Sequence, residues 1–245
     1  MRRLCAGALA GAFAVSTAAA CYADAPAASA PAGTSAVTRL FERHSLSQWA
    51  YPLSATLAHA TPSARSRVVG RLRFFTSDKQ AELYVALASA TLASGQAWIQ
   101  VELPGRPNGT TGWVLRGALG SLHVVHGYLL INRRTLRAKL FRKGHAVFSV
   151  PVGVGKASTV TPAGSFYVLE KLRSLGPFYG PFAIGTSAYA PTLSEWPGGG
   201  VVGIHGTNEP QLIPGRPSHG CIRMRNRDIT RLWRMISLGT PIEIV

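Results

Sequence analysis

The sequence contains few cysteines, three in 245 residues. Two of them, Cys5 and Cys21, lie in an N-terminal segment that we expect to be removed, which leaves Cys221 as the thiol of the mature protein. Because a disulfide joins two thiols, this count excludes a structural disulfide framework. Cys221 follows a glycine and has two histidines nearby in the sequence, so we interpret it as a candidate nucleophile.

Acidic residues are also scarce. The chain has 10 Asp and Glu against 26 Lys and Arg, a formal net charge of +16 at pH 7. Such a basic excess favours nucleic-acid binding in a cytoplasmic protein and contact with anionic envelope polymers in an exported one. The arginines are scattered along the chain, so we interpret most of them as a solvated surface. We predict no nucleic-acid partner and keep anionic cell-wall polymers as candidate neighbours.

Long hydrophobic runs are missing beyond the N-terminus. The basic start Met1-Arg2-Arg3 precedes an uncharged run to Ala20 and then small residues, a pattern typical of a secretory signal peptide. No later run approaches the roughly 20 residues of a membrane-spanning helix. We predict residues 1–23 to be the signal peptide and the protein to be exported to the bacterial cell envelope, the periplasm or the cell wall. Membrane contact is expected only if Cys21, which follows three alanines as in a lipoprotein cleavage box, is lipidated.

The N-terminal half is predicted to hold a linker and a small β module. We interpret residues 24–48 as the linker, because its first part is dominated by Ala, Pro, Ser and Gly, which bury little apolar surface. Residues 49–119 alternate short apolar segments with turn residues, as short strands do. With Trp98, a Pro-Asn-Gly turn and Gly112-Trp113-Val114, this module resembles the bacterial Src-homology-3-like barrels of envelope proteins. The strands expected in it include residues 81–87, 97–102 and 112–114.

Residues 120–245 are predicted to form a second, β-rich domain. One helix is expected from Asn226, which we interpret as its N-cap, with an apolar stripe starting at Ile229 and an end at Gly239. The predicted fold class is therefore mainly β, a small barrel followed by a β-rich domain with a helix after the cysteine loop. The strands expected in this domain include residues 122–131, 146–152 and 242–245.

The residues around Cys221 are those that a thiol nucleophile requires. A cysteine attacks a carbonyl as the thiolate, yet an unperturbed thiol is mostly protonated at neutral pH. His205 and His219 are the candidate bases, and the N-terminus of the helix near Asn226 would add a positive field. Gly220 allows a tight turn, so we expect the backbone N–H groups of Gly220 and Cys221 to face a developing oxyanion.

These residues belong to an ordered set of motifs. His205-Gly206-Thr207 lies upstream of Ser218-His219-Gly220-Cys221-Ile222-Arg223-Met224, with twelve residues between His205 and Ser218. This set resembles the signature of the L,D-transpeptidases, which have a YkuD-like catalytic domain. One difference is Arg223, because some members have Asn two residues after the cysteine. The resemblance covers roughly residues 122–245 and includes residues 151–156, 161–166 and 179–185.

The resemblance implies cysteine acyl transfer on peptidoglycan stem peptides, without a metal or other cofactor. Cys221 would attack the carbonyl of the third residue and expel the terminal D-Ala, with His205 as general base. An amine of a second stem peptide would then resolve the thioester into an L,D cross-link of the 3-3 type. The resemblance also implies that Gly206 orients the imidazole and that His219 and Gly220 shape the oxyanion site. Residues expected at the substrate are Ser218, Gly206, Tyr189 and Arg223.

Other interpretations stay open. Water would resolve the same acyl-enzyme in an L,D-carboxypeptidase, and an amine of a protein would attach that protein to peptidoglycan. A zinc hydrolase would use His205, His219 and Cys221 as ligands and Glu209 as its base. No Cys-x-x-Cys or His-Glu-x-x-His motif accompanies these residues, so we predict no metal site. A wall-binding protein with a silent catalytic fold is the non-enzymatic alternative.

Overall fold

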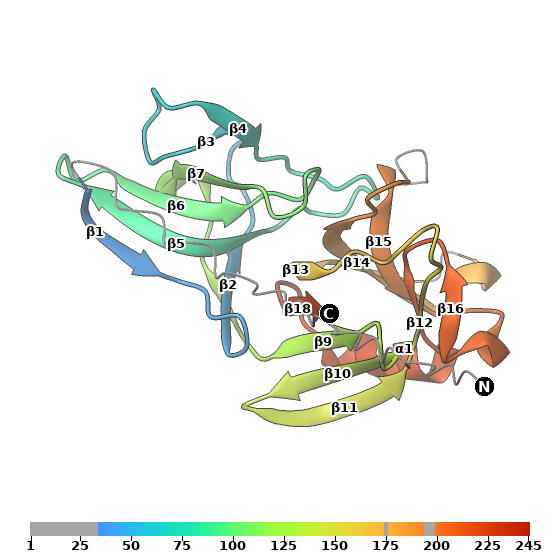
Figure 1. Ribbon diagram of the computed structural model, residues 1–245. Helices are drawn as coiled ribbons and strands as arrows, with labels where there is room; N and C mark the ends of the chain where they lie inside the picture. The colour runs from blue at the N-terminus through green and yellow to red at the C-terminus, as the bar shows by residue number, and fades with distance from the viewer. Residues whose placement is uncertain (1–33, 174–175, 194–198) are drawn as a thin grey trace, which may run out of the picture.

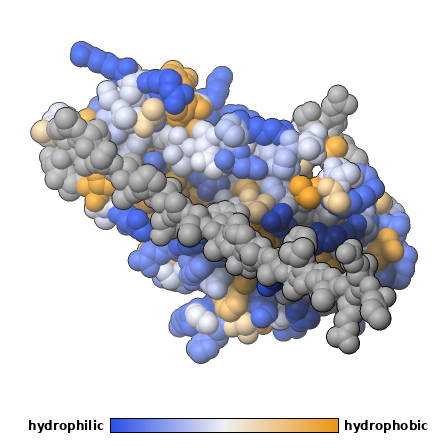
Figure 2. Space-filling model, viewed as in Figure 1, coloured by the Kyte–Doolittle hydropathy of each residue, from blue (hydrophilic) through white to orange (hydrophobic). Residues whose placement is uncertain are grey.

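The computed structural model describes residues 34–173, 176–193 and 199–245 (Figure 1). The predicted signal peptide and residues 24–33 of the predicted linker lie outside these ranges. The described part is mainly β, as predicted, and its strands form an eight-stranded and a ten-stranded sheet. In the view of Figure 2, hydrophilic residues cover most of the surface and apolar residues gather in small separate patches. No helix of the described residues is long and apolar enough to cross a membrane.

The eight-stranded sheet forms the N-terminal module. Its strands are β1 (Thr34–Arg39), β2 (Leu46–Ala50), β3 (Leu57–His59), β4 (Val68–Arg71), β5 (Tyr84–Leu92), β6 (Ala97–Glu102), β7 (Thr111–Leu115) and β8 (His123–His126). The order is β4-β3-β7-β6-β5-β2-β8, and β1 also pairs with β5. The strand predicted over residues 97–102 is confirmed as β6, whereas the one predicted over residues 81–87 begins later, as β5.

Two predicted boundaries in this module are wrong. Residues 34–48 were assigned to the linker, but they contain β1 and most of β2, both paired antiparallel with β5. The partner strand lies about 50 residues away in the sequence, and such pairing overrides local composition. Residues 122–131 form two strands instead of one, because Gly127 has φ +119° and sits so close to the Phe141 carbonyl that a Cβ would overlap it. The two sheets therefore divide at Gly127, and not at residue 120.

The ten-stranded sheet forms the second module, together with α1 (Asn226–Met235). Its strands are β9 (Tyr128–Asn132), β10 (Arg137–Arg142), β11 (His145–Pro151), β12 (Gly153–Gly155), β13 (Gly164–Arg173), β14 (Phe182–Tyr189), β15 (Val201–His205), β16 (Gly215–Ser218), β17 (Ile222–Arg223) and β18 (Pro241–Ile244). The order is β11-β10-β9-β18-β13-β14-β15-β17-β12-β16. The predicted closing strand is β18, which pairs with both β9 and β13 and so joins the two halves of the sheet.

Helix α1 follows the cysteine loop, as predicted, and buries Ile229 and Leu232. The prediction of Asn226 as its N-cap is wrong, because Arg225 holds that position without a side-chain capping bond. The Asn226 side chain instead accepts the backbone N–H of Thr207 at 2.9 Å. It therefore fixes the segment that follows β15 to the start of α1.

The helix also ends earlier than predicted. Its last residue is Met235, and the next residue, Ile236, is already in an extended conformation. Gly239 has φ +72° and lies in the turn before β18, where a Cβ would overlap the indole ring of Trp49. Gly239 therefore allows the close packing of the two modules and does not terminate the helix.

The two modules share an apolar cluster. Trp49, Leu83 and Val85 of the N-terminal side pack with Tyr167 and Leu169 of β13. These five side chains are at most 8% exposed. Burial of this extent holds the two sheets against each other.

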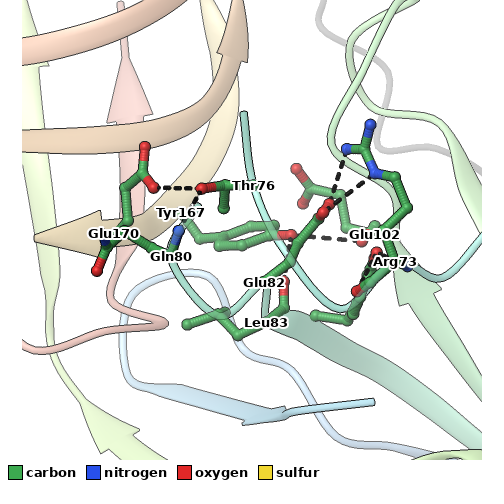
Figure 3. Close-up of polar contacts among 9 residues, drawn as sticks. Arg73, Thr76, Gln80, Glu82, Leu83, Glu102, Tyr167 and Glu170 are labelled. Atoms are coloured by element: carbon green, nitrogen blue, oxygen red, sulfur yellow. Dashed lines mark hydrogen bonds and ion pairs between the residues drawn. The ribbon is translucent and has the colours of Figure 1, made fainter. Parts of the chain in front are cut away.

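Polar contacts surround this cluster (Figure 3). The Tyr167 hydroxyl donates to the Leu83 carbonyl at 3.2 Å, and the Thr76 hydroxyl donates to the Glu170 carboxylate at 2.7 Å. The Ser187 hydroxyl of β14 donates to the Glu102 carboxylate at 3.0 Å. Burial is the main cause that raises the pKa of Glu102 and of Glu170 to about 7. The contact between the modules therefore contains two carboxyl groups that take up protons more readily than usual.

Candidate active site

The thiol and the imidazole line the same cavity because β17 pairs in parallel with β15. Ile222 is the partner of Ile204, and Arg223 is the partner of His205. Cys221 directly precedes β17, so this register brings it to the same cavity as His205. The cavity has a volume of about 20 Å³, which is the space of a single water molecule.

His205 is buried and its ring is oriented by the backbone. Nδ1 lies 2.6 Å from the Gly206 carbonyl oxygen. Because a carbonyl only accepts, Nδ1 carries the proton and Nε2 keeps a free lone pair. The Tyr179 ring packs edge-on against the imidazole with 4.9 Å between centroids. The structure therefore leaves Nε2 as the basic atom of this side chain.

Burial keeps the imidazole neutral. Desolvation is the main cause that lowers the pKa of His205 to about 4 from its ordinary 6.5. The hydrogen bond to the Gly206 carbonyl raises this pKa, and the positive charge of Arg223 lowers it further. At neutral pH the ring is therefore an uncharged base.

The Cys221 thiol is free and also mainly uncharged. Desolvation raises its pKa above the ordinary 9.0, while a hydrogen bond from the Gly203 backbone and the charge of Arg223 oppose this rise. Burial therefore favours the uncharged form of both Cys221 and His205 in the resting site. The positive group that acts on both is the guanidinium of Arg223.

The cysteine loop is held by a closed set of hydrogen bonds. The Ser218 hydroxyl donates to the Cys221 carbonyl at 2.5 Å and accepts the Gly220 N–H at 3.1 Å. The Thr161 hydroxyl donates to the Gly220 carbonyl at 2.7 Å and accepts the Gly155 N–H at 2.9 Å. Gly220 has φ +123°, which favours glycine. The loop is therefore rigid around the thiol.

These bonds bear on the roles of Ser218 and Gly220. Ser218 lines the cavity, yet its hydroxyl is used within the loop, so its contribution is to loop shape more than to substrate contact. The Gly220 amide, expected to face an oxyanion, is engaged by Ser218. This leaves the Cys221 amide as the candidate donor. His219 is exposed and lines the same cavity.

Arg223 lies in the cavity wall and is 5% exposed. Its Nη1 donates to the Glu209 carboxylate at 2.8 Å, and its guanidinium lies 4.8 Å from the Phe178 ring centroid. Among the residues that the structure describes, its buried Nε has no hydrogen-bond partner. The cavity wall therefore contains a buried positive charge that Glu209 anchors.

Two predicted residues lie away from the cavity. The Tyr189 ring packs under the guanidinium of Arg106, at 5.1 Å, and Tyr189 is not among the residues that line the cavity. The Gly206 carbonyl is the partner of His205 Nδ1, and Gly206 is not among the residues that line the cavity. Glu209, the base in the zinc alternative, is paired with Arg223. Within the described ranges, no three His, Cys, Asp or Glu side chains are grouped to hold a metal ion.

Several cavity residues were not identified from the sequence. Phe178 and Tyr179 lie beside His205, and the motif that begins at Tyr179 was the available signal. Ala190, Leu193 and Gly200 form another wall, and no local pattern marks them.

The comparisons with known proteins agree with these motifs. The YkuD family model, the L,D-transpeptidase catalytic domain, matches residues 126–244. The YkuD protein of Bacillus licheniformis is 40% identical over 114 residues, which cover 46% of this chain and 61% of that protein. The YqjB protein of Bacillus subtilis is 35% identical over 127 residues, which cover 48% of this chain and 70% of that protein. Both relatives have L,D-transpeptidase in their names.

The match to these relatives is confined to part of each chain. This chain spans 61% and 65% of the lengths of the YkuD proteins of Bacillus licheniformis and Bacillus subtilis. Among solved structures, the catalytic domain of an E. faecium L,D-transpeptidase aligns with a TM-score of 0.38 and 23% identity, over 48% of this chain and 95% of that one. On the sequence matches, the chain belongs to the L,D-transpeptidase family with the YkuD catalytic domain.

Proposed function

We propose that this chain is a cysteine acyltransferase that acts on peptidoglycan stem peptides and forms L,D cross-links of the 3-3 type. The observation that carries this proposal is the shared cavity of Cys221 and His205, with His205 Nδ1 bonded to the Gly206 carbonyl. This tautomer leaves Nε2 free to accept the thiol proton. Membership of the family supports the same chemistry.

Acylation starts from an uncharged Cys221 thiol and an uncharged His205 imidazole. The Cys221 sulfur attacks the carbonyl carbon of the third stem residue while its proton passes to His205 Nε2. The tetrahedral intermediate carries a negative oxygen, for which the Cys221 amide is the candidate donor. The carbon–nitrogen bond to D-Ala breaks, His205 returns the proton to the leaving amine, and a thioester on Cys221 remains. In the intermediate, the positive charge on His205 balances the negative oxygen, so the net charge of the site does not change.

Transfer reverses these proton movements. The amine of a second stem peptide attacks the thioester carbonyl and gives its proton to His205. The carbon–sulfur bond breaks, the new amide forms, and the proton returns to the sulfur of Cys221. Water in place of the amine gives a shortened stem peptide, which is the L,D-carboxypeptidase alternative, and an amine of a protein gives its attachment to peptidoglycan. In each case the positive charge of Arg223 in the cavity wall favours a carbonyl or carboxylate of the stem peptide.

The proposed location is the cell envelope. Residues 1–23 have the pattern of a signal peptide, and the net charge of +16 suits a neighbourhood of anionic polymers. The N-terminal module, which we predict to be Src-homology-3-like, would then be placed at the wall together with the catalytic module.

The test is incubation of the purified protein with disaccharide-tetrapeptide, followed by mass analysis of the products. We expect a cross-linked dimer and free D-Ala from the wild type, and neither from Cys221→Ala. A product limited to disaccharide-tripeptide identifies the carboxypeptidase alternative. Unchanged turnover by Cys221→Ala would refute the acyl-enzyme. Thermal unfolding of the variant, compared with the wild type, verifies that the loss is chemical.

A further inference from the structure

We propose that the loop of residues 103–110 in the N-terminal module positions one wall of the catalytic cavity, with Arg106 and Asn108 as the positioning residues. The kinetic part of this inference rests on the proposed function. The part that concerns access to the Cys221 thiol does not.

The wall consists of Ala190, Leu193 and Gly200, which line the cavity together with Cys221. These residues follow β14 and precede β15. The Ala190 N–H donates to the Gly200 carbonyl at 2.8 Å, which closes the segment at its base. The described ends of the wall are thus tied to each other, and further hydrogen bonds reach them from the N-terminal module.

Arg106 supplies that support with four hydrogen bonds to three carbonyl groups. Nε and Nη2 donate to the Ala190 carbonyl at 3.2 and 2.9 Å, and Nη2 also donates to the Leu193 carbonyl at 2.8 Å. Nη1 donates to the Gly199 carbonyl at 2.6 Å. A guanidinium presents its donors in one rigid plane. One side chain therefore sets the relative position of both ends of the wall.

Asn108 makes the adjacent contact. Its Nδ2 donates to the Tyr189 carbonyl at 2.9 Å, and its Oδ1 accepts the Tyr189 N–H at 2.8 Å. The carboxamide thus satisfies the last backbone groups of β14 in the way a neighbouring strand would. The Tyr189 ring also lies under the Arg106 guanidinium. This explains why Tyr189 faces the N-terminal module and not the substrate.

Gly200 provides independent evidence that the cavity wall and the Arg106 guanidinium are closely packed. It has φ +84°, and a Cβ at this position would overlap the Leu193 carbonyl and Nη2 of Arg106. A side chain at position 200 would therefore exclude the arginine from its place. The sequence supplies the one residue type that allows the close approach.

The loop that carries both residues is itself fixed. The Leu103 N–H donates to the Thr110 carbonyl at 2.8 Å, and the Thr110 hydroxyl donates to the Pro107 carbonyl at 2.7 Å. At the base of the loop, Glu102 accepts the Ser187 hydroxyl of β14. These bonds hold the loop in one conformation, so it loses little conformational entropy when it contacts the cavity wall. Because the cavity is narrow, a shift of this wall alters both the fit of a substrate and access to the thiol.

The kinetic test compares Arg106→Ala, Arg106→Lys and Asn108→Asp with the wild type on disaccharide-tetrapeptide. We expect kcat/KM to fall by about 10- to 100-fold in Arg106→Ala, mainly through KM, because a small displacement of a substrate-positioning group has this effect. Arg106→Lys should not rescue activity, because an ammonium group cannot span three carbonyls. Asn108→Asp keeps the acceptor and loses the donor, so a smaller fall is expected. Arg71→Ala, an exposed arginine of β4, is the matched control and should keep the wild-type kinetics.

The second test measures the rate at which iodoacetamide alkylates Cys221 at about pH 8, by mass spectrometry of the peptide that contains it. Loss of the wall contact should expose the thiol, so we expect a rise of about threefold or more in Arg106→Ala and Asn108→Ala. Wild-type alkylation rates in both variants would overturn the inference. If the wild-type protein converts no stem peptide, the proposed function fails, and the alkylation rates alone still decide the position of the wall.

Discussion

The buried carboxyl group of Glu102 should make the stability of this protein depend on pH. The residue is partly exposed, but its carboxyl group is enclosed between β6 and β14, where it accepts the Ser187 hydroxyl. Burial raises its pKa from 4.5 to about 7. In the unfolded chain this carboxyl loses its proton near pH 4.5, whereas in the folded protein it keeps the proton until about pH 7. Glu102 therefore makes its full contribution to the free energy of unfolding below pH 4.5. This contribution declines as the pH rises from 4.5 to about 7.

The magnitude follows from the difference between the two pKa values. Each pH unit within this window removes up to about 1.4 kcal/mol from the free energy of unfolding. The full loss from Glu102 is therefore at most about 3.5 kcal/mol. Glu170 titrates in the same range and adds a decline of its own. The contribution of Glu102 is isolated by Glu102→Gln, which keeps an acceptor for Ser187 and removes the titration.

The assay is urea unfolding of the wild type and Glu102→Gln at about pH 5 and about pH 8, at constant ionic strength. We expect the variant to gain about 2 kcal/mol relative to the wild type between the lower and the higher pH. Glu42→Gln, an exposed glutamate of the same module, is the control and should show no such gain. An equal effect of Glu102→Gln at both pH values would refute the assignment of a protonated Glu102.

Three further results are expected. The acid limb of the kcat/KM profile should lie near the His205 pKa of about 4 and not near 6.5; a limb near 6.5, measured on disaccharide-tetrapeptide, would contradict a neutral buried base. Thr161→Val leaves the Gly220 carbonyl and the Gly155 N–H without their partner; it should lower the free energy of unfolding by about 1 to 3 kcal/mol, and an unchanged value in urea unfolding would contradict the role of this hydroxyl. Gly127→Ala should destabilise by about 1 to 3 kcal/mol, whereas Gly117→Ala, with open space around it, should not; equal midpoints in thermal unfolding would contradict this.

The elements predicted correctly from the sequence are those whose structure depends on neighbouring residues in the chain. The strand β6 alternates apolar and polar residues between clear turns, and α1 has an apolar face at Ile229 and Leu232. The cysteine loop was recognised because Gly220 and its neighbours form a compact motif. The same motif, together with the upstream histidine, led to the family. Each of these signals lies within about 20 residues of chain.

The parts that were missed depend on contacts between distant segments. β1 forms because it pairs with the edge of β5, about 50 residues later. The composition of β1 alone resembles that of a linker. Asn226 has the side chain of an N-cap but is used by Thr207, 19 residues upstream. The bonds of Arg106 to the cavity wall span 84 to 93 residues. No single-sequence pattern carries such pairings, because either partner alone looks like an ordinary loop or surface residue.

The fixed charge of Arg223 makes the proposed proton transfer asymmetric. It lies beside both reacting groups, where it favours a negative sulfur at Cys221 and disfavours a positive imidazole at His205. A proton taken up by His205 is therefore in an unfavourable site, and its transfer to the leaving amine removes that cost. Glu209 balances this charge from a position that is 42% exposed, so water reaches the ion pair and weakens the compensation. Arg223 thus sets the charge of the cavity that Cys221 and His205 share.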